Sequence, residues 1–94
     1  MFIVLLRFSD NKAKAGQFME GHKQWIGRGF DDGVFVMTGS LQPNRGGMVL
    51  VTGASRAQLE ARVNADPFVA ERVVEADILE VAPSRADPRL GFLA

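Results

Sequence analysis

Residues 34–52, VFVMTGSLQPNRGGMVLVT, carry the clearest indication of how this chain folds. They hold two apolar runs, 34–41 and 48–52, and the segment between them contains one Pro and two Gly. Turn-forming residues between two short apolar runs are typical of a β-hairpin. The centre of the chain is therefore predicted to form two antiparallel strands.

On either side of this hairpin the pattern changes to that of a helix. The preceding segment, residues 11–30, ends in Asp31-Asp32-Gly33, which has the composition of a turn. Its apolar stripe, at the spacing of one helix face, consists of Phe18, Met19, His22, Trp25 and Ile26. After the hairpin, Ser55 and Gln58 match a capping box, so a second helix is expected to begin there, with Leu59 and Val63 on its buried side.

Two further strands are expected at the outer ends. Residues 2–8 are apolar on both alternating faces, and a last strand is predicted over residues 76–82, before Pro83. The order β-α-β-β-α-β predicts an α+β, ferredoxin-like sandwich: a four-stranded antiparallel sheet with both helices on one face. The chain is interpreted as a single domain, 1–94, with a core of residues 1–83 and a C-terminal tail of residues 84–94.

The first strand also bears on assembly. Phe2, Val4, Leu6 and Phe8 fall on one face, and Ile3 and Leu5 fall on the other. Because both helices of such a sandwich cover the same face of the sheet, we expect the helix-free face, whichever of the two it is, to pack against a second subunit, in a homodimer or a higher homo-oligomer. The tail carries apolar residues near its end, and the sequence leaves open whether it covers a pocket or clasps the partner subunit.

Composition narrows the classes of function. The chain has 11 Lys and Arg against 11 Asp and Glu and no basic cluster, so nucleic-acid binding is not expected. It has no Cys and one His, which argues against a transition-metal site and against thiol chemistry, and no cofactor is expected. No apolar run approaches the roughly 20 residues of a membrane-spanning helix, so a cytoplasmic protein is expected.

The chemistry of the chain centres on its single histidine, His22. An imidazole within an apolar stripe is either a polar group at the edge of the core, bonded to backbone, or a proton-transfer group in a pocket. Its candidate partner is Asp66, which precedes Pro67. Asp before Pro is also a common helix start, in which the carboxylate accepts backbone N–H groups and proline fills the first helical position. Both roles of Asp66 can coexist, with one carboxylate oxygen capping and the other facing His22.

Four features together resemble the YciI-like (YCII-related) family of small proteins. They are the apolar first strand, the histidine in the middle of the first helix, the segment Thr38-Gly39-Ser40-Leu41, and Ala65-Asp66-Pro67-Phe68-Val69. The resemblance covers most of the chain to Val81 and implies a dimeric α+β barrel. It also implies that His22 and Asp66 meet in an active-site cleft. Ser40 stands where the family often has proline.

On this basis His22 and Asp66 are the candidate catalytic residues. The candidate substrate-binding residues are Gly39, Ser40, Trp25, Pro67 and Phe68. Each of three of these residues also has a purely structural interpretation. Gly39 and Ser40 could simply end a strand, and Trp25 could simply pack in the hydrophobic core.

The expected function is that of a small cofactor-free enzyme of the lyase or isomerase type, which moves a proton on a small metabolite. The lyase or isomerase class comes from analogy with related dimeric α+β barrels. The alternative is a non-catalytic domain that binds a small molecule or assembles with a protein partner.

Overall fold

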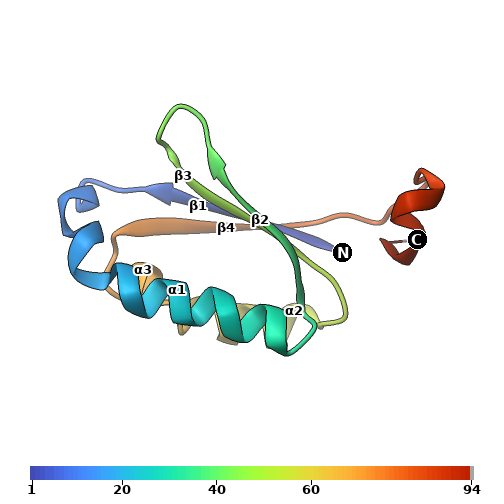
Figure 1. The fold of residues 1–94 in the computed structure, drawn as a ribbon, viewed down its shortest axis with the longest axis horizontal. Coiled ribbons are helices and arrows are strands. Elements are labelled where there is room, and N and C mark those ends of the chain that lie inside the picture. Colours follow the sequence, from blue (N-terminus) through green and yellow to red (C-terminus); the bar gives the residue numbers. More distant parts are fainter. Residues whose placement is uncertain (94) are drawn as a thin grey trace.

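The computed structural model describes residues 1–93 and confirms the predicted architecture. Four strands, β1 (Phe2–Phe8), β2 (Phe35–Leu41), β3 (Gly46–Val51) and β4 (Val74–Glu80), form one antiparallel sheet in the order β2-β3-β1-β4. Three helices, α1 (Ala15–Asp31), α2 (Arg56–Asn64) and the short α3 (Pro67–Ala70), lie on one side of this sheet (Figure 1). The fold is therefore α+β and ferredoxin-like.

The alternation of residues along β1 separates the two faces of the sheet. Phe2, Val4 and Leu6 are buried in the core beneath the helices, whereas Ile3 and Leu5 are only half-buried on the opposite face. Residues that pair directly across an antiparallel ladder share a face. The register therefore assigns six apolar side chains to the helix-free face: Ile3, Leu5, Met37, Met48, Leu50 and Leu79.

Helix α1 begins at Ala15, four residues later than residue 11, where the sequence predicted it. The single-turn 3₁₀ helix η1 (Lys12–Lys14) occupies the intervening residues. Two glycines of α1 allow close approach of other elements. A methyl group at Gly29 would overlap the ring of Phe35, and one at Gly21 would lie 3.0 Å from Pro67 Cγ. Gly21 thus makes room for α3.

The two helices after the hairpin begin with the predicted caps. Ser55 Oγ accepts a hydrogen bond from the backbone N–H of Gln58, and Gln58 Oε1 accepts one from the backbone N–H of Ser55. These two hydrogen bonds complete the capping box of α2. Leu59 and Val63, on its buried side, are in the core as predicted. At α3, Asp66 caps the helix by accepting the amide of Phe68, and Pro67 fills its first position.

The boundaries of three strands differ from the predicted ones, by one residue at the start of β2 and at the end of β3, and by two residues at the start of β3 and at both ends of β4. Strand β3 begins at Gly46, so Gly46 and Gly47 belong to the strand and not to the turn. Gly46 has φ of +129°, and a side chain there would overlap the carbonyl oxygen of Leu6, so the pairing of β3 with β1 requires glycine. Strand β4 begins at Val74 and ends at Glu80, two residues before the predicted limits at each end.

The tail leaves the body of the domain after β4. Its last segment, η2 (Pro88–Leu93), consists of two 3₁₀ turns joined by a kink at Leu90, and it lies at one end of the molecule, away from the first turns of α1 at the other end (Figure 1). Asp87 Oδ1 accepts hydrogen bonds from the side-chain Nε and the backbone N–H of Arg89. These hydrogen bonds lower the pKa of the Asp87 carboxyl. Leu90 and Phe92 are exposed. Among residues 1–93, no helix is both long and apolar enough to cross a membrane.

Candidate functional site

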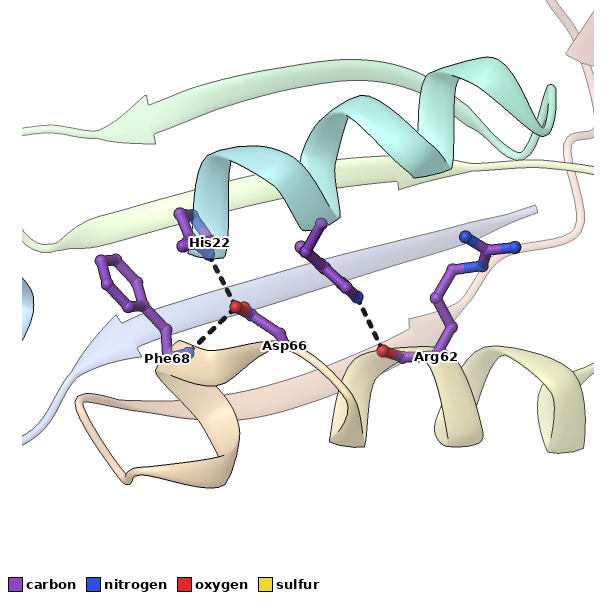
Figure 2. A network of polar contacts seen from close by, with 5 residues as sticks. His22, Arg62, Asp66 and Phe68 are labelled. Carbon is purple, nitrogen blue, oxygen red and sulfur yellow. Dashed lines mark hydrogen bonds and ion pairs between the residues drawn. The ribbon is translucent and has the colours of Figure 1, made fainter. Parts of the chain in front are cut away.

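The contact predicted between His22 and Asp66 is present. Imidazole Nδ1 of His22 lies 2.8 Å from carboxylate Oδ1 of Asp66 (Figure 2). The Asp66 side chain is fully buried, whereas 14% of the His22 side chain is exposed. The carboxylate therefore lies behind the imidazole, on the side away from solvent.

Two elements position this pair. His22 lies in the first half of α1, and Asp66 is the N-cap of α3, where its Oδ1 also accepts the amide of Phe68 at 3.0 Å (Figure 2). The Phe68 ring stacks on the imidazole, with ring centroids 4.0 Å apart and planes 6° apart. The imidazole is thus held by a hydrogen bond to its edge and an aromatic contact on its face.

One carboxylate oxygen performs both roles of Asp66. The sequence suggested that the cap and the imidazole contact would use different oxygens, but Oδ1 accepts both hydrogen bonds. Oδ2 is the one buried side-chain polar atom without a hydrogen-bond partner among residues 1–93. Buried polar atoms normally have a hydrogen-bond partner. Oδ2 has lone pairs that no described residue uses, and it can therefore accept a hydrogen bond.

The hydrogen-bond geometry also assigns roles to the two ring nitrogens. Because a carboxylate can only accept, Nδ1 is the donor, and a neutral His22 carries its hydrogen there. Nε2 then has a free lone pair. Nε2 makes no hydrogen bond to the described residues and is not among their buried polar atoms. It is therefore the nitrogen available to a ligand.

His22 lines a cavity of about 460 Å³ between α1 and the sheet. The wall formed by α1 consists of Met19, His22, Lys23 and Ile26. The facing wall is the β2–β3 hairpin, with Thr38, Gly39, Ser40 and Gly47, and the floor includes Leu6, Phe8 and Val49. A cavity of this volume, apolar with a few polar groups, suits a small organic molecule.

The predicted site residues divide into two groups. His22, Gly39, Ser40 and Phe68 line the cavity. Asp66, Trp25 and Pro67 do not. Trp25 lies in the core, 2% exposed, and its Nε1 donates to the carbonyl of Arg62 at 2.8 Å. Pro67 packs toward Gly21 on α1.

The cavity also contains residues that the sequence did not single out. Thr38 lies two positions before Ser40 and, by strand alternation, shares its face of β2. Its pairing with the buried Val49 shows that this face is the one toward the helices. Lys23 follows His22 directly on α1 and lines the same wall. The alternation of β2 could have identified Thr38, but nothing in the sequence placed Lys23 at the cavity.

No family model, curated protein or solved structure matches this chain. Within the described part of the chain, no group of three or more His, Cys, Asp or Glu side chains is arranged to hold a metal ion.

Proposed function

We propose that this protein is a small cofactor-free enzyme of the lyase or isomerase type, in which His22 moves a proton on a small metabolite. The observation that carries the proposal is the 2.8 Å contact between His22 Nδ1 and the fully buried Asp66 carboxylate, beside a cavity that His22 lines. An imidazole oriented by a carboxylate, with its other nitrogen free, is a common arrangement for general acid–base catalysis.

The proposed step is a proton shuttle. Nε2 takes a proton from a carbon or oxygen atom of the bound substrate, and the imidazolium that forms is stabilised by the Asp66 carboxylate. Nε2 then returns the proton to another atom of the same molecule, or to its leaving group. Ser40, whose hydroxyl has no partner among the described residues, donates a hydrogen bond to a substrate carbonyl. No electron is gained or lost.

We also propose that the chain is a member of the YciI-like family and that it forms a homodimer through the helix-free face of its sheet. The family assignment is supported by the motif residues, by the ferredoxin-like strand order, and by the contact of the motif histidine with the motif aspartate. The dimer is supported by the six apolar side chains on the helix-free face.

Deuterium exchange tests the proton-transfer role without knowledge of the net reaction. The protein is incubated in D₂O with a panel of small lactones, keto acids and enolisable aromatic compounds, and loss of substrate ¹H signals is followed by NMR. Wild type is expected to accelerate exchange of at least one compound, and His22→Gln to slow it by roughly 10²–10⁴-fold. Glu20→Gln, on an exposed turn of α1 outside the cavity, is the control and is expected to match wild type.

Two results would contradict the proposal. The first is no exchange of any compound by wild type, and the second is equal exchange by wild type and His22→Gln. Either would favour the alternative, a non-catalytic domain that binds a small molecule in this cavity or assembles with a partner.

A further inference from the structure

We propose that the ligand of the cavity is a small organic carboxylate with an apolar body, and that Lys23 binds its carboxylate. This inference names the ligand class of the same cavity and so rests on the proposed function. Its first support is the charge of the lining. The only ionisable side chains that line the cavity are His22 and Lys23, and no Asp or Glu lines it.

Lys23 is available to a ligand. Four arginines, Arg7, Arg56, Arg62 and Arg89, each contact a carboxylate at 3.4 Å or less. Among residues 1–93, no hydrogen bond or ion pair engages the ammonium group of Lys23. An unpaired ammonium beside a cavity without carboxylates creates a positive potential there, which favours anionic over neutral ligands.

The rest of the lining suits an apolar body. Leu6, Phe8, Val49, Ile26 and Phe68 present hydrocarbon or aromatic surface, and Thr38 and Ser40 add two hydroxyl groups. A dianionic ligand such as a phosphate ester would require more donors or cations than this wall supplies, because each charge removed from water needs compensation. A single carboxylate on an aromatic or aliphatic body matches the available groups.

The arrangement on α1 also orients such a ligand. Lys23 is exposed and lines the cavity, so its flexible side chain can bring the ammonium to the mouth, while the more buried His22 precedes it on the same helix. A carboxylate held at the mouth keeps part of its hydration, and the apolar body extends inward past Nε2 of His22. Lys23 would then determine specificity and position the ligand, while the proton transfer itself belongs to His22.

Binding measurements test the inference directly. The probes are benzoate, phenylacetate and 3-phenylpropanoate, each compared with its primary amide, in ¹H–¹⁵N NMR titrations of the full chain. Wild type is expected to bind at least one carboxylate about fivefold more tightly than its amide, the effect of one partly exposed charge-assisted contact. Lys23→Met is expected to lose this preference and Lys23→Arg to keep it. Lys14→Met, an exposed lysine of η1 outside the cavity, serves as the matched control.

The inference is overturned if wild type binds none of the carboxylates, if it binds amides equally well, or if Lys23→Met keeps the preference. His22→Gln, titrated in parallel, separates this inference from the proposed function. A carboxylate preference that survives in His22→Gln, together with no deuterium exchange by wild type, would contradict catalysis and support the assigned ligand class. Deuterium exchange that requires His22, together with equal binding of carboxylates and amides, would support catalysis and contradict the assigned ligand class.

Discussion

Asp66 Oδ1 accepts two hydrogen bonds, from the imidazole of His22 and from the amide of Phe68, and this shared acceptor joins the site to the fold. The sequence predicted each contact separately, from the family resemblance and from the Asp-Pro helix start. It could not predict that one oxygen makes both, because sequence separation carries no information on distance. The presence of Lys23 at the cavity was unpredictable for the same reason.

The shared acceptor predicts an unequal response of stability to two substitutions at residue 66. Asp66→Ala removes the cap of α3 and leaves the buried Phe68 amide and His22 Nδ1 without an acceptor. We expect the free energy of unfolding to fall by about 2–4 kcal/mol. Asp66→Asn keeps an acceptor oxygen, so its free energy of unfolding should fall clearly less than that of Asp66→Ala. Urea denaturation of both variants measures the difference, and equal losses would show that the shared oxygen contributes little.

At the scale of elements, α1 is held by its contacts more than by its intrinsic propensity. Its four glycines weaken the helix, but Gly29 and Gly21 lie against Phe35 and Pro67. Apolar patterns, the turn residues of the hairpin and the capping box at Ser55 together were sufficient to predict every strand and both longer helices. Several ends were displaced because they are set by other segments: η1 precedes α1, and β3 extends to Gly46 because it pairs with β1.

Two glycines on this one helix predict effects of opposite sign. A methyl group at Gly27 meets no atom within 4 Å, so Gly27→Ala is expected to stabilise the protein by up to about 1 kcal/mol. Gly29→Ala would overlap Phe35 and is expected to destabilise it by about 1–3 kcal/mol, despite the same gain in helix propensity. Thermal and urea unfolding of the two variants test this. A stabilised Gly29→Ala would mean that the ring of Phe35 moves aside readily.

At the scale of the whole molecule, the sheet separates two surfaces with different environments. The helix side encloses the core and the cavity, whereas the opposite side leaves Met37 47% and Leu79 42% exposed. From the sequence, the alternation in the first strand already indicated two apolar faces. It could not identify which face the helices cover, because that depends on how α1 crosses the sheet.

The proposed dimer predicts a change of mass on substitution of the helix-free face. Met37→Lys combined with Leu79→Lys places two charges on it, and we expect a dimeric wild type to become monomeric while its circular dichroism stays unchanged. Phe30→Lys is the matched control, because Phe30 is 43% exposed but lies at the end of α1. Light scattering after size exclusion gives the masses. A monomeric wild type, or a double variant that remains dimeric, would contradict the proposed interface.

The two walls of the cavity differ in how freely they could diverge over evolution. The wall that carries His22 is tied through Asp66 to the start of α3, so substitutions at Asp66 disturb the contact with the imidazole and the cap of α3 together. The hairpin wall contributes Thr38, Gly39 and Ser40, whereas the Asp66 carboxylate bonds to His22 and Phe68. A change in the preferred ligand would therefore arise most readily from substitutions on the hairpin wall, which leave the imidazole and its carboxylate in place.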